Sequence, residues 1–166
     1  MALRQDYRTP RWLFDILNED FGPFTLDAFA DKDNALCASY LDGSLGNDGF
    51  DNDCWSGNVF ANPPFAFSGR AVVTADLAAT MHKVKSACML LQAGISTRWF
   101  HDWACSWTVL IPNCRINYES PDPALKLKGF NRDSIIVLFG PKWHCNSIRP
   151  YYIRKRREAA YYSAIG

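Results

Sequence analysis

The chain has 166 residues, a formal net charge of +1 at pH 7, 48% apolar residues and 14% aromatic residues. This length and composition predict a single globular domain over residues 1–166 with a sizeable core, and they exclude a disordered chain. No stretch approaches the roughly 18 consecutive apolar residues of a membrane span, and the N-terminus lacks the apolar run of a signal peptide, so we expect no membrane partner and a cytoplasmic location.

The charges are unevenly distributed along the chain. Between residues 15 and 53 the single base is Lys32, and the acids are Asp15, Glu19, Asp20, Asp27, Asp31, Asp33, Asp42, Asp48, Asp51 and Asp53. Between residues 142 and 157 there is no acid, and the bases are Lys142, Arg149, Arg154, Lys155, Arg156 and Arg157. Such a basic C-terminal segment, about 142–166, is typical of contact with phosphates, and a solvated helix end is the alternative.

Six cysteines lie far apart, with no Cys-x-x-Cys and no nearby histidine pair. The spacing predicts neither a metal site nor a disulfide framework. We expect free, mostly buried thiols and a reducing cytoplasm.

The first elements follow from capping and periodicity. Thr9-Pro10 predicts a helix N-cap followed by proline at the first helical position, with a helix that ends near Gly22. Residues 24–27 predict a short strand that ends at Asp27. An acid at this place can pair with a ligand's ammonium group or cap the next helix, which we expect near Lys32.

A second strand is predicted over residues 38–42. Asp42 ends it, and an acid at such a position often binds ribose hydroxyls. Residues 43–57 are rich in Gly, Asn and Asp and predict a loop just before the next strand.

Residues 58–67 carry the most informative motif, in which a short apolar strand runs into Asn62-Pro63-Pro64-Phe65. The two prolines can neither continue a sheet ladder nor enter a helix, so the backbone is stiff. The Asn62 side chain and the Pro63 carbonyl could accept both hydrogens of a planar NH2 group such as adenine N6, which favours a pyramidal nitrogen. Phe65 could stack on the ring. The alternative is a plain strand-to-turn junction.

Later segments predict a helix over 68–81, a buried strand over 86–92 and a helix from Thr97 to Trp103. Strands are expected over 108–111, 114–118 and 134–139. The loop 120–132 carries Lys126 and Lys128 and is a candidate phosphate contact. Together these elements predict an α/β fold with a three-layer sheet and a C-terminal antiparallel strand pair.

The motifs resemble a known family. Asn62-Pro63-Pro64-Phe65 is similar to the fourth motif of the amino-methyltransferases that use S-adenosylmethionine. Thr9-Pro10, residues 26–35 and Arg115-Ile116-Asn117-Tyr118 add a resemblance to the short phage and prophage DNA adenine-N6 methyltransferases. The resemblance covers roughly residues 7–140, and it implies the Rossmann-like methyltransferase fold, S-adenosylmethionine as cofactor and DNA as substrate.

The resemblance also implies residue roles. Tyr7, Thr9 and Pro10 would pack against the methionine end of the cofactor, and Asp27 and Ala28 would belong to the cofactor loop. In this sequence Ala28-Phe29-Ala30-Asp31 stands where related methyltransferases have a glycine-rich loop. The target adenine would be rotated out of the duplex into the pocket beside Asn62 and Phe65.

Two rival functions stay open. The first is a protein glutamine N5-methyltransferase, which methylates a planar amide nitrogen and so meets the same chemical problem. Those enzymes have a fuller glycine-rich loop and an added N-terminal helical domain, and this sequence shows neither. A DNA-binding module that has lost catalysis is the second. Base recognition would come from residues 43–57, from residues 120–132, from the basic tail or from a second subunit in a homodimer.

Overall fold

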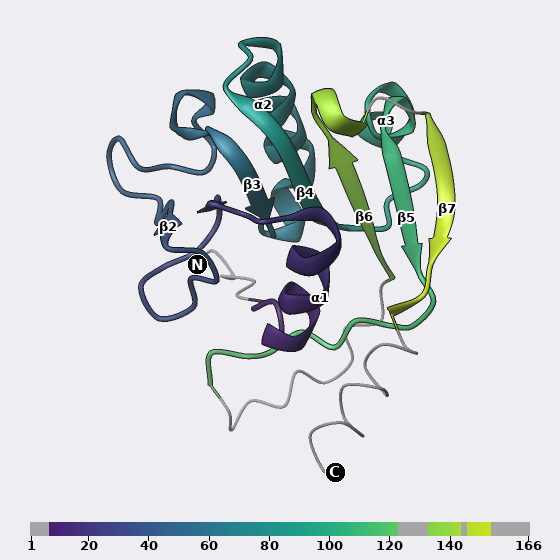
Figure 1. The fold of residues 1–166 in the computed structure, drawn as a ribbon, viewed down its shortest axis with the longest axis horizontal. Coiled ribbons are helices and arrows are strands. Elements are labelled where there is room, and N and C mark those ends of the chain that lie inside the picture. Colours follow the sequence, from purple (N-terminus) through teal and green to yellow (C-terminus); the bar gives the residue numbers. More distant parts are fainter. Residues whose placement is uncertain (1–6, 123–132, 144–145, 154–166) are drawn as a thin grey trace.

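The computed structural model describes residues 7–122, 133–143 and 146–153 (Figure 1). The strands are β1 (Leu26–Asp27), β2 (Ser39–Tyr40), β3 (Gly57–Ala61), β4 (Val84–Gln92), β5 (Thr108–Pro112), β6 (Ser134–Phe139) and β7 (Ser147–Tyr151). The α-helices are α1 (Arg11–Phe21), α2 (Ser68–Thr80) and α3 (Arg98–Asp102). The short 3-10 turns are η1 (Asn52–Cys54), η2 (Phe65–Phe67), η3 (Ala104–Ser106) and η4 (Pro141–Trp143).

These strands form one sheet in the order β2-β1-β3-β4-β6-β5-β7, which confirms the predicted α/β class. Strands β1 to β4 are parallel, β6 is antiparallel to β4 and β5, and β7 is parallel to β5. The antiparallel pair β5–β6 is therefore present, but β7 extends the sheet beyond it. Because β1 lies between β2 and β3, the direction of chain progression reverses at β1, and α/β sheets bind ligands at such a point.

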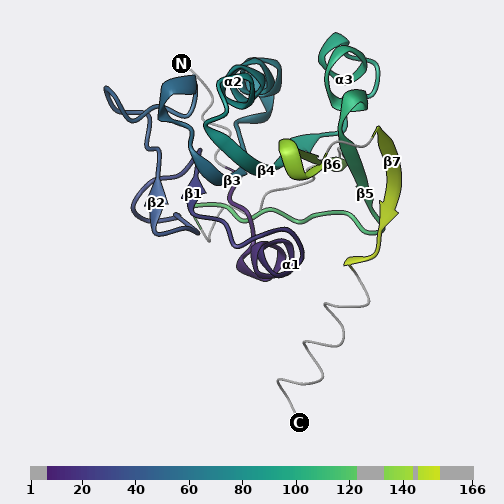
Figure 2. The same cartoon turned by 45° about the horizontal axis from the view of Figure 1, so that its top comes forward.

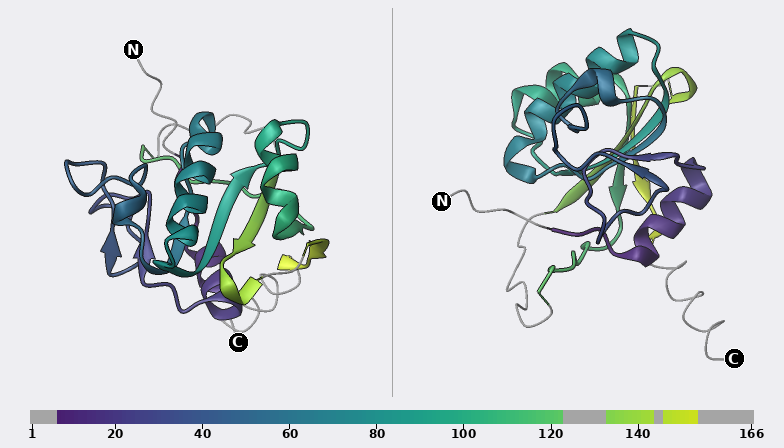
Figure 3. Two further views of the ribbon diagram at one scale, coloured as in Figure 1. Left: turned by 90° about the horizontal axis from the view of Figure 1, so that it is seen from above. Right: turned by 90° about the vertical axis from the view of Figure 1, so that its left-hand side faces the viewer.

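Helices cover both faces of the sheet. Helix α1 lies on one face, and α2 and α3 lie on the other (Figures 2 and 3). The alternation of side chains along β3 explains the two cores, because Val59 and Ala61 pack with α2 whereas Phe60 packs with α1. Burial of both faces accounts for the nearly continuous apolar sequence of β4 and β6.

Helix α1 confirms the first predicted helix but not its cap. Pro10, not Thr9, occupies the N-cap position, and no side chain caps this end. The Pro10 carbonyl accepts hydrogen bonds from the N–H groups of Leu13 and Phe14. The Thr9 hydroxyl is therefore available for another partner.

The helix expected near Lys32 is absent. The Asp31 side chain accepts from the Asp33 N–H at 2.8 Å, and the Asn34 side chain accepts from the Asp31 N–H at 2.6 Å. These side chains accept hydrogen bonds from backbone N–H groups within a tight turn, as Asp and Asn often do, and this local bonding competes with helix formation.

Residues 114–118 do not form the expected strand. The segment has no regular secondary structure, and its apolar side chains Ile116 and Tyr118 are buried in the core beneath α1. The Tyr118 hydroxyl lies 2.8 Å from the Ser134 hydroxyl. The apolar pattern of this segment therefore indicates that its side chains are buried, and it does not indicate pairing with a neighbouring strand.

Two further differences concern apolar faces and the C-terminal region. In α2 the small residues Ala71, Ala75 and Ala78 face the sheet, whereas the larger Val73 and Leu77 are 59% and 49% exposed. Strand β7 was not predicted, because it lies within the basic C-terminal segment that was interpreted as a phosphate contact. Its Pro150 is compatible with an edge strand, where one side of the backbone needs no ladder partner.

Within the described ranges no helix is long and apolar enough to cross a membrane, and no cluster of His, Cys, Asp or Glu could hold a metal ion. The cysteines of these ranges are free. Cys88 is fully buried, and burial raises the pKa of its thiol. The others, Cys37, Cys54, Cys105 and Cys114, are half-buried, and Cys145 lies outside the described residues.

Candidate active site

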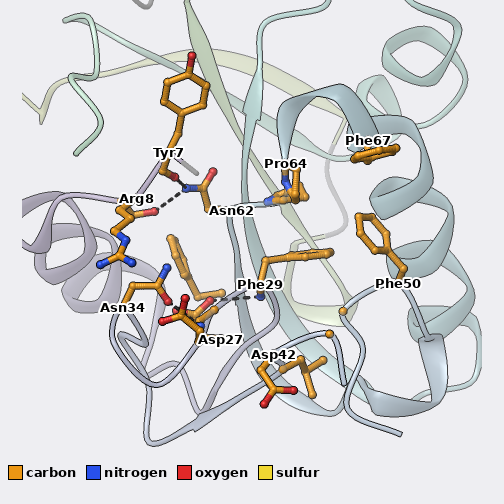
Figure 4. A pocket seen from close by; sticks show the side chains of 18 of the residues that line it. Tyr7, Arg8, Asp27, Phe29, Asn34, Asp42, Phe50, Asn62, Pro64 and Phe67 are labelled. Carbon is orange, nitrogen blue, oxygen red and sulfur yellow. Dashed lines mark hydrogen bonds between the residues drawn. The ribbon is translucent and has the colours of Figure 1, made fainter. Parts of the chain in front are cut away.

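A cavity of about 340 Å³ lies at the carboxyl ends of β1, β2 and β3 (Figure 4). Its size is within the range of about 300–1,000 Å³ that small-molecule sites occupy. Parallel strands bring their carboxyl ends to one edge, so residues from positions 7 to 67 meet here. The lining residues predicted from sequence are Tyr7, Thr9, Asp27, Asp42, Asn62, Pro63, Pro64 and Phe65.

Two predicted cofactor residues do not line the cavity. Ala28 is fully buried, and its N–H donates to the Phe60 carbonyl at 2.9 Å. Pro10 is buried at the start of α1. Each of them directly follows a lining residue in the chain, Asp27 for Ala28 and Thr9 for Pro10.

Asn62 leaves the end of β3 with its side chain tied to the N-terminal segment. Its Nδ2 donates to the Tyr7 carbonyl oxygen and to the Thr9 hydroxyl oxygen, both at 2.9 Å (Figure 4). Within the described part of the chain, neither Asn62 Oδ1 nor the Pro63 carbonyl has a hydrogen-bond partner. The two acceptors that the motif predicts are thus present and unused.

The turn after the prolines is closed by local hydrogen bonds. The Phe67 N–H donates to the Pro64 carbonyl at 2.8 Å, and the Ser68 hydroxyl donates to the Phe65 carbonyl at 2.9 Å. Helix α2 begins directly afterwards. These bonds convert a strand end into a rigid corner, which fixes the direction of Phe65.

Phe65 belongs to an aromatic cluster. Its ring lies 5.8 Å from the Tyr7 ring at 28° and 5.3 Å from the Tyr118 ring at 75°, measured between centroids. Phe65 is 7% exposed. Stacked and edge-to-face geometries of this kind hold aromatic rings in place, so the cavity presents a firm apolar wall beside the Asn62 amide.

Asp27 lines the cavity from the end of β1 and is 3% exposed. Its carboxylate accepts from the Leu36 N–H at 3.1 Å and from the Phe29 N–H at 3.4 Å. Burial raises its pKa to about 6, although these two hydrogen bonds act in the opposite direction. A cation in the cavity would restore the ionised form.

Asp42 lies at the rim, after β2, and is exposed. Its Oδ1 accepts from the Ser44 N–H at 3.0 Å, from the Ser44 hydroxyl at 2.6 Å and from Asn47 Nδ2 at 2.9 Å. These hydrogen bonds lower the pKa of Asp42. The carboxylate is thus held in one orientation and stays ionised.

Sequence reasoning missed a second aromatic wall. Phe29 and Phe50 meet edge to face at 4.9 Å, Phe67 lies 5.9 Å from Phe50, and the Arg70 guanidinium stands 4.5 Å above the Phe50 ring. Phe50 reaches the cavity because Trp55 is fully buried and its Nε1 donates to the Gly49 carbonyl at 2.9 Å. A tryptophan inside a polar loop was the available signal, since such a side chain anchors the loop to a core.

Arg8 was also missed, and it is the one basic side chain among the described lining residues. Its backbone exchanges hydrogen bonds of 2.9 Å with Glu119 in both directions. Its Nε is buried and has no partner in the described residues. A buried guanidinium nitrogen without a partner is costly, so this atom is suited to an anionic ligand group.

The expected DNA-contact residues Lys126, Lys128 and Arg154-Lys155-Arg156-Arg157 lie outside the described residues. Of the basic segment, Lys142 and Arg149 are described and exposed. His101, on α3, is exposed and does not line the cavity.

The structure is an α/β protein with a cavity at the carboxyl edge of its sheet and the Asn62-Pro63-Pro64-Phe65 turn beside that cavity. A family model described as DNA N-6-adenine-methyltransferase (Dam) matches residues 1–160. The chain belongs to this family. No solved structure matches.

Two curated relatives agree with the family. The chain is 27% identical over 154 residues to the "DNA N-6-adenine-methyltransferase" of Haemophilus phage HP1 (strain HP1c1), which covers 89% of this chain and 85% of that protein. It is 42% identical over 69 residues to "Putative methyltransferase YfdM" of Escherichia coli (strain K12), which covers 36% of this chain and 69% of that protein.

Proposed function

We propose that this protein transfers a methyl group from S-adenosylmethionine to the N6 atom of adenine in DNA. The observation that carries the proposal is the cavity in which the Asn62 and Pro63 acceptors lie together with Asp27, at the end of β1, and Asp42, after β2. The family match supports DNA as the substrate over a protein amide. The three-layer arrangement with an antiparallel pair supports the methyltransferase fold.

The cavity suits S-adenosylmethionine in charge. This cofactor carries a sulfonium, an ammonium and a carboxylate, so its net charge is positive. Among the described lining residues the one base is Arg8, and the acids are Asp27, Asp31, Asp42 and Asp48. Asp27 would hold the ammonium, Asp42 a ribose hydroxyl, and the unpartnered Nε of Arg8 the carboxylate.

At the reacting nitrogen the protein supplies alignment. When bound, S-adenosylmethionine supplies an electrophilic methyl group. Asn62 Oδ1 and the Pro63 carbonyl would accept the two N6 hydrogens, which favours a pyramidal nitrogen with its lone pair directed at that methyl group. Phe65 would contact the face of the base. Since the amine needs orientation more than deprotonation, no strong base is required, and proximity contributes most of the acceleration.

The reacting base must leave the duplex to reach this cavity. Asn62 is half-buried and Phe65 is 7% exposed, so a stacked and paired adenine cannot reach them. We propose that the adenine is flipped into the mouth of the cavity. The basic segment and residues 120–132 would contact the phosphates, and a homodimer would add a second such surface.

The direct test is product identification. The purified protein would be incubated with unmethylated DNA and cofactor labelled on its methyl group, and the DNA digested to nucleosides. We expect the label in N6-methyl-2′-deoxyadenosine. Labelled N4-methylcytosine would correct the target base, and label on protein glutamine would favour the rival enzyme. No product, combined with no cofactor binding by calorimetry, would favour the DNA-binding module that has lost catalysis.

A further inference from the structure

We propose that Thr9, together with the Tyr7 carbonyl, is a positioning group that sets the orientation of the Asn62 amide and thereby determines which of its atoms faces the substrate amine. This inference rests on the proposed function and deepens it. Thr9 was expected to be a cofactor contact, whereas its hydroxyl oxygen is 2.9 Å from Asn62 Nδ2, and the two residues are 53 positions apart.

The orientation of the amide follows from its partners. A backbone carbonyl can only accept, so the Asn62 atom that lies 2.9 Å from the Tyr7 carbonyl must be the NH2 nitrogen. The same nitrogen donates its second hydrogen to Thr9, which is 8% exposed. Both donor positions are therefore occupied, and Oδ1 is the atom left to a ligand.

The N-terminal segment is itself held in place. Arg8 pairs with Glu119 through two backbone hydrogen bonds of 2.9 Å, and α1 starts two residues after Thr9. The Tyr7 ring also stacks on Phe65. The segment is thus anchored on both sides of Thr9, so its two acceptors form a fixed template for the amide.

The chemical consequence concerns the substrate. An amide rotated by 180° would present its NH2 group to the amine of adenine, where donor meets donor and neither hydrogen is accepted. Only the orientation that Thr9 and Tyr7 enforce is productive. A carboxylate would supply the amine with the same acceptor, yet it has no hydrogen for the Tyr7 carbonyl, so this template requires Asn in place of Asp.

The test separates positioning from cofactor contact. Thr9→Val keeps the shape of the side chain and removes the acceptor, Thr9→Ser keeps the acceptor, and Asn62→Asp keeps an acceptor toward the substrate. Thr80→Val is the matched control, because the Thr80 hydroxyl bonds the Asp76 carbonyl on the exposed side of α2, away from the cavity. Single-turnover methylation of DNA at saturating cofactor and the Kd for S-adenosylmethionine by calorimetry are measured for each.

We expect Thr9→Val to slow the methyl-transfer step by roughly three- to tenfold, since one neutral hydrogen bond is removed. Its cofactor Kd should stay within about twofold of the wild type, because the removed hydrogen bond joins Thr9 to Asn62 and not to the cofactor. Thr9→Ser should restore most of the rate, Asn62→Asp should be slower than Thr9→Val, and Thr80→Val should match the wild type.

Three outcomes would overturn the inference and leave the proposed function intact. A raised Kd in Thr9→Val with an unchanged rate at saturation would make Thr9 a cofactor contact. Wild-type rate and Kd in Thr9→Val would leave it no role. If Thr9→Val fails to fold, Asn62→Asp decides, because full activity there would show that the Tyr7 carbonyl imposes no constraint. A wild-type protein that methylates no DNA would instead overturn the proposed function, and this inference with it.

Discussion

The carboxylate of Asp27 accepts a hydrogen bond of 3.1 Å from the N–H of Leu36, nine residues later in the chain. This bond joins the end of β1 to the turn that leads into β2 and closes one wall of the cavity. Asp27 is 3% exposed, and its pKa is raised to about 6 because burial disfavours the charge. A buried acid that titrates near neutral pH gives two predictions.

The first is that cofactor affinity depends on pH through Asp27. If the Asp27 carboxylate holds the ammonium of S-adenosylmethionine, the ionised form is required. Affinity should be constant above about pH 7 and fall by up to about tenfold for each unit below pH 6. Calorimetry between pH 5 and 8 measures this. 5′-Methylthioadenosine lacks the amino-acid end, so its affinity should not change in this window, and an equal pH dependence for both ligands would contradict the assignment.

The second is that Asp27→Asn stabilises the free protein while it weakens cofactor binding. The folded-state pKa is raised above the ordinary value near 4, so the folded state binds more protons between about pH 4 and 6, and stability falls as pH rises through this window. Asn removes this cost but accepts fewer hydrogen bonds, so we expect a net gain of about 1–2 kcal/mol at pH 7.5. Urea denaturation measures it. The gain should vanish below about pH 4, and a gain that persists there would have another cause.

Asn62→Ala should keep cofactor binding and lose most methyl transfer. Under the proposed mechanism the variant deletes an acceptor whose hydrogen bond would strengthen as the amine becomes pyramidal, and loss of one such group typically costs on the order of a hundredfold or more in rate. Single-turnover kinetics and calorimetry measure both properties. Asn52→Ala is the control, because Asn52 lies in η1 and does not line the cavity. Wild-type activity in Asn62→Ala would refute the catalytic assignment.

Gly49→Ala should open the loop that forms the aromatic wall. A Cβ at this position would lie 2.0 Å from the Ala28 carbonyl oxygen and 2.7 Å from the Phe29 ring, so backbone must move. We expect a loss of about 1–3 kcal/mol in unfolding free energy and weaker cofactor binding. Gly69→Ala is the matched control in the first turn of α2, where a Cβ meets only Trp99 at an ordinary 3.7 Å, and it should be neutral or gain up to about 1 kcal/mol. Similar behaviour of the two variants would contradict this account.

Replacement of Arg154, Lys155, Arg156 and Arg157 by Ala tests the basic segment, which lies outside the described residues. If these side chains bind phosphates, DNA affinity should fall similarly for every sequence, and the slope of log affinity against log salt should fall by up to about 0.9 for each phosphate that the variant no longer neutralises. Cofactor affinity should not change. If the segment packs against the domain or a second subunit, thermal stability or sedimentation would change instead, and the salt slope would stay the same.

The local sequence was sufficient for the elements and for the chemical motif. The helix before Gly22, the strand over 134–139 and the helix after Ser68 were predicted because their apolar patterns lie within a few residues, although the cap expected at Thr9 was wrong. Asn62-Pro63-Pro64-Phe65 was informative for the same reason, since two prolines and a side-chain acceptor constrain the backbone locally.

Tertiary contacts decided the rest. The pattern at residues 114–118 is apolar enough for a strand, yet no strand of the described residues pairs with it, and pairing depends on segments far away in sequence. The large residues Val73 and Leu77 face outward because the close approach of α2 to the sheet selects Ala. Strand β7 forms because the edge of β5 is available for pairing, and the sequence of residues 147–151 alone does not indicate this partner.

The site itself shows the same division. The sequence by itself determined that Asn62 and Pro63 offer acceptors, that Asp27 ends a strand, and that the motif resembles the amino-methyltransferases. Asp42 was expected to end the second strand, but β2 ends at Tyr40 and Asp42 follows it. Only the tertiary structure shows that the Thr9 hydroxyl bonds Asn62 instead of capping the helix. It also shows that Arg8 lines the cavity, and that Phe50 lines it next to Gly49, whose carbonyl accepts from the buried Trp55. These contacts join residues that are far apart in the chain or lie within loops, and their partners are chosen by the packing of the whole sheet, which no local pattern encodes.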